Sequence, residues 1–112
     1  MDARKALALW HRVAVESLSH DLAELNQRQT AILLEIYLGE PPHTVRGLAR
    51  RLAISKPAVT RALHRLEALD YARRKVDESD KRSVLVQRTV KGSVFLRDFA
   101  DRIGGLAKEA GL

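Results

Sequence analysis

The sequence predicts a mainly α-helical protein with one small β-hairpin. Apolar residues recur at helical spacing in several separate stretches of the 112-residue chain. Two of these stretches are separated by a turn of about three residues, which is typical of a helix-turn-helix. Two short extended stretches flank a polar, charged loop, which is typical of a hairpin. The chain has no cysteine, so disulfides and thiolate zinc sites are excluded.

The first helix is expected from Ala3 to about Leu25, because leucine and alanine recur along it at helical spacing. Charged residues such as Arg4 and Glu16 interrupt this stretch. It therefore lacks the unbroken apolar run of a signal peptide or a membrane span. Together with the absence of cysteine, this predicts a cytoplasmic protein that does not contact a membrane.

A second helix is expected to begin after Asn26 and to end at Gly39. Asn26 and Gln29 have the spacing of a capping box, in which each side chain bonds the backbone N–H of the other residue. Gly39 and the following Glu-Pro-Pro sequence stop the helix.

The helix-turn-helix is expected between Thr44 and Leu69. Thr44 can cap a helix over residues 45–52, and Ser55 can cap the next helix three residues later. Pro57 lies in the first turn of that helix, where its missing N–H costs no hydrogen bond. The proline therefore supports a helix start at this point.

The hairpin is expected from the extended stretches 71–76 and 83–89 around the loop 77–82. Thr89 can cap a last helix, which Gly104 and Gly105 are expected to weaken or end. This order of elements is that of a winged helix-turn-helix. We expect a single domain over 1–112, with an N-terminal helix (1–25), a winged helix-turn-helix core (26–89) and a C-terminal helix (90–112).

Positive charge is concentrated in the middle of the chain. The formal net charge is +6, and residues 43–82 alone carry eleven Lys and Arg against five Asp and Glu. Between Thr44 and Leu66 there are six basic residues and no acidic one. Charge alone would fit an ordinary solvated surface equally well, but such a surface normally intersperses acids. An acid-free face favours a polyanionic partner, and double-stranded DNA fits this helix order best.

The recognition helix is expected over residues 55–69. One face of it carries the apolar side chains Val59, Leu63 and Leu66, and the other face is basic. Lys56 and Arg61 can donate to guanine, Pro57 and Ala58 can contact a thymine methyl, and Thr60 can reach base or phosphate. Arg50, Arg51, Arg65, His64 and the helix N-terminus at Ser55 are expected to contact phosphates. Thr44 and Arg46 are further candidates for DNA binding.

Residues 44–92 resemble the DNA-binding core of the MarR family, the multiple antibiotic resistance regulators of bacteria. The stretch reads TVRGLARRLAISKPAVTRALHRLEALDYARRKVDESDKRSVLVQRTVKG. Its most specific parts are DESDKR, similar to the family pattern Asp-x-Arg-Asp-x-Arg, and TVKG, similar to Leu-Thr-x-x-Gly. The resemblance implies a homodimeric winged-helix transcription factor. The sequence departs from the family pattern at three positions: Asp70 replaces a common glycine, Ser79 an arginine and Arg88 a leucine.

The resemblance also implies how the wing (73–88) binds. It makes Arg82 the residue that enters the minor groove, with Asp80 or Asp77 orienting it through an ion pair. A narrow minor groove attracts arginine, which is compatible with that role. Arg74 and Lys81 are further wing candidates for DNA contact.

A homodimer requires an interface outside the winged helix. Apolar side chains on the first and last helices are candidates, although each stripe could equally be intramolecular core: Leu7, Trp10, Ala14, Phe95, Phe99 and Ile103. About twenty residues follow Gly92, where relatives carry a longer helical pair that walls a ligand pocket. The sequence thus leaves a small-molecule effector open but gives its pocket little support.

Other function classes receive less support. No two of the four histidines have the spacing that places metal ligands on one helical turn, so we expect no metal and no cofactor. Nucleophile motifs and phosphate loops are absent, so we expect no enzymatic activity. Two alternatives remain: a winged helix that docks an acidic protein, and a sequence-blind architectural DNA-binding protein. The favoured function is a sequence-specific regulator that binds DNA at the nucleoid.

Overall fold

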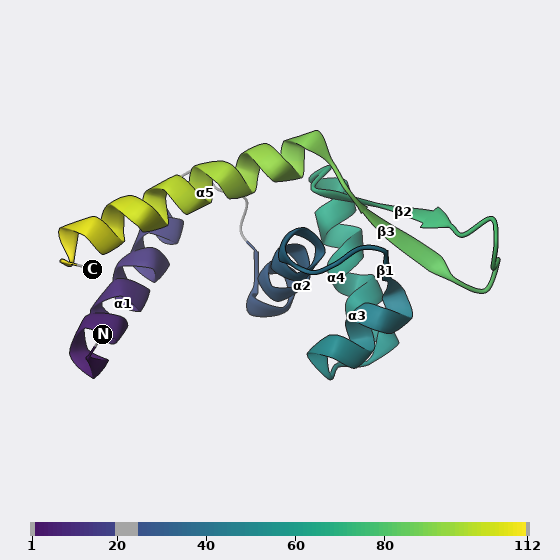
Figure 1. Ribbon diagram of the computed structural model, residues 1–112, viewed down its shortest axis with the longest axis horizontal. Helices are drawn as coiled ribbons and strands as arrows, with labels where there is room; N and C mark the ends of the chain where they lie inside the picture. The colour runs from purple at the N-terminus through teal and green to yellow at the C-terminus, as the bar shows by residue number, and fades with distance from the viewer. Residues whose placement is uncertain (1, 20–24, 112) are drawn as a thin grey trace. The chain divides into compact units, whose positions relative to one another are not determined.

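The computed structural model describes residues 2–19 and 25–111 (Figure 1). In these ranges it contains five α-helices and one three-stranded antiparallel sheet. The elements in chain order are α1 (Ala3–Ser19), α2 (Gln27–Leu38), β1 (His43–Thr44), α3 (Val45–Leu52), α4 (Lys56–Ala68), β2 (Ala72–Val76), β3 (Val84–Arg88) and α5 (Val90–Glu109). The predicted mainly α-helical winged helix with a small hairpin is confirmed.

The chain forms two compact units. The larger unit spans residues 25–94 and contains α2, α3, α4, the sheet and the start of α5. The described part of the smaller unit contains α1 and the rest of α5, from Phe95 onward. Within the smaller unit, Arg12 of α1 pairs with Glu109 of α5 at 2.6 Å.

The core of the larger unit is aliphatic and lies between its three helices. Ile32 and Ile36 of α2 are fully buried, as are Val59, Leu63 and Leu66 of α4. The apolar stripe of the recognition helix therefore packs into the core, as its spacing predicted. Burial of such side chains stabilises the fold by roughly 1.5–3 kcal/mol each. The opposite, basic face of α4 therefore points toward solvent.

The predicted caps at two of the helix starts are formed. Asn26 and Gln29 make both hydrogen bonds of the capping box, at 2.8 and 2.9 Å. The Thr44 hydroxyl accepts from the Gly47 N–H at 2.9 Å at the start of α3. Each bond satisfies a backbone donor that the helix itself leaves unpaired.

The turn of the helix-turn-helix comprises residues 53–55. Ala53 ends α3 in the left-handed conformation, with φ of 56°. Ser55 then accepts from the Ala58 N–H at 3.2 Å and begins α4. Pro57 lies in the first turn of α4, as predicted, and supports the helix start.

The sheet has the strand order β1-β3-β2. The hairpin pairs β2 with β3 from Ala72↔Arg88 to Val76↔Val84, which confirms the predicted wing. On its other side β3 pairs with β1, through Thr44↔Leu85. The sequence did not predict β1, because a strand of two residues is too short to show the alternation of apolar and polar residues that marks a strand. This pairing ties the N-terminus of α3 directly to the wing.

Three local features differ from, or add to, the sequence-based expectation. The first helix was expected to reach about Leu25, but α1 ends at Ser19 and Leu25 is not helical, while residues 20–24 lie outside the described residues. Gly104 and Gly105 were expected to weaken or end the last helix. They do not end it, since α5 continues to Glu109. Two glycines cost a helix about 2 kcal/mol, but this cost does not end α5. Asp70 has φ of 60°, a left-handed conformation that favours glycine.

Candidate nucleic-acid interface

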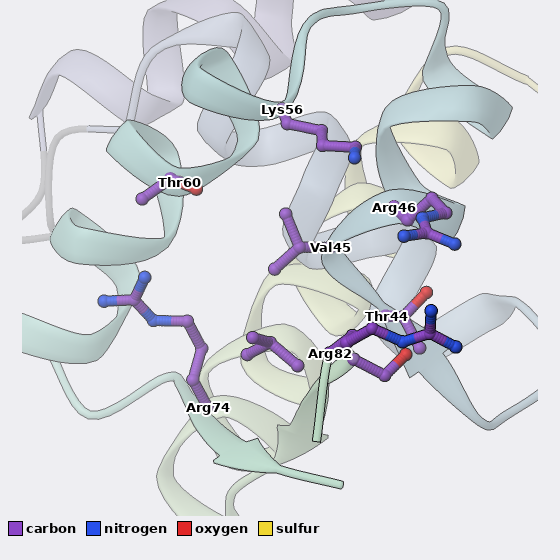
Figure 2. A pocket seen from close by; sticks show the side chains of 9 residues that line it. Thr44, Val45, Arg46, Lys56, Thr60, Arg74 and Arg82 are labelled. Carbon is purple, nitrogen blue, oxygen red and sulfur yellow. The ribbon is translucent and has the colours of Figure 1, made fainter. Parts of the chain in front are cut away.

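A groove lies between the helix-turn-helix and the wing (Figure 2). Its volume is about 230 Å³. Residues from the start of α3, from α4 and from the hairpin line it: Thr44, Val45, Arg46, Lys56, Thr60, Arg74, Arg82, Ser83 and Val84. Four of these nine side chains are Arg or Lys and none is acidic. The groove therefore presents concentrated positive potential between low-dielectric walls.

The outer face of α4 is exposed as its helical spacing predicted. Pro57, Arg61, His64 and Arg65 are all exposed, and Thr60 is half-buried in the wall of the groove. Ala58 is only 6% exposed and belongs to the core. It therefore offers little surface for contact with a thymine methyl.

The candidate cations divide into free and paired groups. Arg51 of α3 donates to the Glu35 carboxylate of α2 at 2.7 Å. Arg74 of β2 donates to Glu67 in the last turn of α4. Among the described residues, six candidates have no ion pair with an acid: Arg46, Arg50, Lys56, Arg61, Arg65 and Lys81. These six carry the uncompensated charge of the interface.

The wing loop orients Arg82 through Asp80. The Asp80 carboxylate accepts from the Arg82 backbone N–H at 3.1 Å and lies 3.3 Å from its Nε. Asp77 instead accepts from the hydroxyl and the N–H of Ser79, at 2.7 and 2.9 Å. These two hydrogen bonds hold the pKa of Asp77 below its usual value. Of the two carboxylates left open by the sequence, Asp80 is the partner of Arg82.

No local signal in the sequence indicates the acidic partners Glu35 and Glu67 or the role of Arg88. Arg88 donates from Nε to the Ile36 carbonyl at 3.1 Å and from a terminal nitrogen to the Tyr37 carbonyl at 3.0 Å. These carbonyls belong to the last turn of α2, where helices leave acceptors unpaired. Arg88 therefore fastens the end of β3 to α2 and is not part of the groove.

The candidate dimerisation residues lie in the smaller unit. On α1, Leu7 is 70% exposed, Trp10 is 66% exposed, and Ala14 is exposed beside them. On α5, Phe95, Phe99 and Ile103 are half-buried, and the two phenylalanine rings stack with centroids 6.3 Å apart. Exposed large apolar side chains along one helix are typical of an unfilled interface.

Across residues 2–19 and 25–111, no three His, Asp or Glu side chains gather closely enough to hold a metal ion. In the same part of the chain, none of the helices combines the length and apolar character needed to span a bilayer.

Solved structures share this fold. A variant of Staphylococcus aureus MepR bound to an oligodeoxyribonucleotide matches with a TM-score of 0.80 and 19% identity, over 93% of this chain and 74% of that one. The transcriptional regulator Tm0710 from Thermotoga maritima matches with a TM-score of 0.72 and 26% identity, over 95% and 75%. A MarR variant from E. coli, complexed with operator DNA, matches with a TM-score of 0.70 and 24% identity, over 96% and 71%.

Sequence comparison gives the family. No curated protein sequence matches this chain significantly. The model of the MarR family matches residues 23–83, which include α2, the helix-turn-helix and most of the wing. Because that match covers more than half of the chain and the fold agrees with it, this protein belongs to the MarR family.

Proposed function

We propose that this protein is a sequence-specific transcriptional regulator that binds double-stranded DNA, with α4 in the major groove and the wing at the minor groove. The observation that carries the proposal is the acid-free groove between the helix-turn-helix and the wing, which is lined by Arg46 and Lys56 on one side and by Arg74 and Arg82 on the other. Such a surface repels itself when empty and is relieved by phosphates. The DNA-bound state of the MepR and MarR relatives supports the same function.

The groove residues have distinct roles in this proposal. Lys56 and Arg61 are placed to read bases, because the N-terminal part of a recognition helix enters the major groove most deeply. Arg50 and Arg65, exposed and without acidic partners among the described residues, bind phosphates. Arg82, held by Asp80, reaches the minor groove. No catalytic step and no cofactor enter the proposal, which places the protein on nucleoid DNA in a bacterial cytoplasm.

The active form in this proposal is a homodimer. Two copies of α4, related by two-fold symmetry, would read half-sites about one helical turn apart. The exposed stripe of Leu7, Trp10 and Ala14 is the surface we assign to the second copy. Exposed apolar helix faces of this kind are commonly buried between subunits in oligomers.

Footprinting and a salt series test the proposed function. A sequence-specific regulator should protect a defined site on genomic fragments, and its affinity should fall steeply as salt rises. A docking module for an acidic protein would show only weak, sequence-blind retention on DNA. An architectural protein would show the salt dependence without a defined footprint. Either of these two results would contradict the proposal.

Substitution of Trp10 by Ala tests the dimer. The side chain is 66% exposed in the single chain, so its loss should leave the protomer folded but weaken association by about tenfold or more in Kd. Sedimentation velocity across a concentration series would measure the change. Arg4→Ala, a substitution of another exposed residue of α1, serves as the control. Unchanged mass for Trp10→Ala at every concentration would remove α1 from the interface.

A further inference from the structure

The ion pair between Glu67 and Arg74 joins the recognition helix to the wing. Glu67 lies in the last turn of α4, and Arg74 is the central residue of β2. Both side chains are largely covered, with 32% and 27% of their surface exposed. The pair is therefore shielded from water more than the exposed pair formed by Arg82 and Asp80. A partly buried pair of this kind is less screened by salt.

The bond leaves part of Arg74 free for another partner. Arg74 donates to Glu67 through Nε, and its terminal nitrogens make no other protein hydrogen bond in the part of the chain that the structure describes. The same side chain lines the groove together with Lys56 and Thr60 (Figure 2). A guanidinium has five donors in a rigid fork, so one can be held while others bind a phosphate.

We propose that Glu67 is a positioning residue, which holds Arg74 so that its free nitrogens bind a DNA phosphate at the junction of α4 and the wing. The inference rests on the proposed function. An arginine already fixed in its bound rotamer loses less conformational entropy when DNA arrives. Glu67 thereby improves DNA affinity even though its own charge repels the phosphates.

The sign of one substitution decides between this role and simple charge repulsion. If Glu67 acted only as a negative charge near DNA, Glu67→Ala would tighten binding and steepen its salt dependence. If it positions Arg74, Glu67→Ala weakens binding, by about fivefold on the cognate site. It also makes the slope of log K against log salt shallower, by up to about 0.9, the value of one phosphate contact.

Two matched controls are present in the chain. Glu78→Ala removes the same charge from an exposed loop position that has no ion pair among the described residues, so binding should stay unchanged or tighten slightly. Arg73→Ala removes an arginine next to Arg74 whose side chain is 69% exposed and lies 3.6 Å from Asp70. Successive strand residues face opposite sides, so it should lower affinity less than Arg74→Ala does.

A double-mutant cycle completes the test. Combining Glu67→Ala with Arg74→Ala should weaken binding no further than Arg74→Ala alone, because Glu67 acts through Arg74. If Glu67→Ala lowers the melting temperature so far that the variant is not folded in the binding assay, the DNA affinities of Glu67→Gln and Glu78→Gln are compared instead. Glutamine removes the charge but keeps the shape of the side chain. The positioning role is supported if the Glu67 variants bind DNA more weakly than the wild type while the Glu78 variants do not. Equal or tighter binding overturns it, while absence of salt-dependent DNA binding by the wild type would overturn the proposed function itself.

Discussion

Replacing Arg61 by Ala is expected to weaken binding to the cognate DNA by about 1–3 kcal/mol, or roughly 5- to 150-fold in Kd. Arg61 is exposed on the face of α4 opposite the buried Val59 and Leu63. It also lacks an acidic partner in the described part of the chain, so its donors are free for guanine O6 and N7. Sequence preference at the contacted base pair should relax as well. Gel-shift titrations on the cognate site and on single-base variants would measure both effects.

Arg65→Ala is the matched control for this prediction. Arg65 is also exposed on α4, one turn further from the N-terminal end, where we expect a phosphate contact. Its loss should weaken cognate and non-cognate binding alike and reduce the salt slope by about one. If Arg61→Ala behaves in this same uniform way, then Arg61 contacts the backbone and the assignment of its role as a base reader is wrong.

The helices and the hairpin could be predicted because their signals are local. Asn26 with Gln29, Thr44, and Ser55 with Pro57 each mark a helix start within a few residues, and the structure forms all three caps. The limits of such reasoning appear where a distant segment decides. The strand β1 exists only because residues 43–44 meet β3 some forty positions later. Of the two effects expected of Gly104 and Gly105, ending the helix is contradicted, because α5 continues past them to Glu109.

The basic surface could be predicted as a region of the sequence, but which of its charges are unpaired could not. The acid-free stretch from Thr44 to Leu66 correctly located the basic face. Which cations are neutralised depends on packing between elements. Arg51 meets Glu35 only because α3 packs on α2, and Arg74 meets Glu67 only because β2 lies on α4. Counting charge along the sequence therefore overstates the positive potential of the interface.

A hydrogen-bond cluster around Tyr37 connects α2 to the start of α5. The Tyr37 hydroxyl donates to the Thr89 carbonyl at 2.8 Å and accepts from the Thr89 N–H at 3.0 Å. The Thr89 hydroxyl accepts from the Gly92 N–H at 2.9 Å and donates to the Asp70 carbonyl at 2.7 Å. Thr89 was expected to cap the last helix, whereas Tyr37 carries no local signal of its role. The cluster also gives a physical reason for the glycine in the TVKG motif.

Gly92→Ala should therefore destabilise the protein by about 3 kcal/mol or more, lowering Tm by roughly 12 °C or more. A Cβ at Gly92 would overlap both the Tyr37 hydroxyl and the Tyr71 carbonyl, so either the start of α5 or the end of α2 must move. Moving them breaks hydrogen bonds to buried groups, which costs more than the added methyl gains. Gly104→Ala is the control, because nothing lies within 4 Å of a Cβ there and alanine favours the helix by about 1 kcal/mol. Thermal melts followed by circular dichroism should thus shift in opposite directions for two identical substitutions in one helix. Equal melting temperatures for the two variants would contradict the close approach of Tyr37 to Gly92.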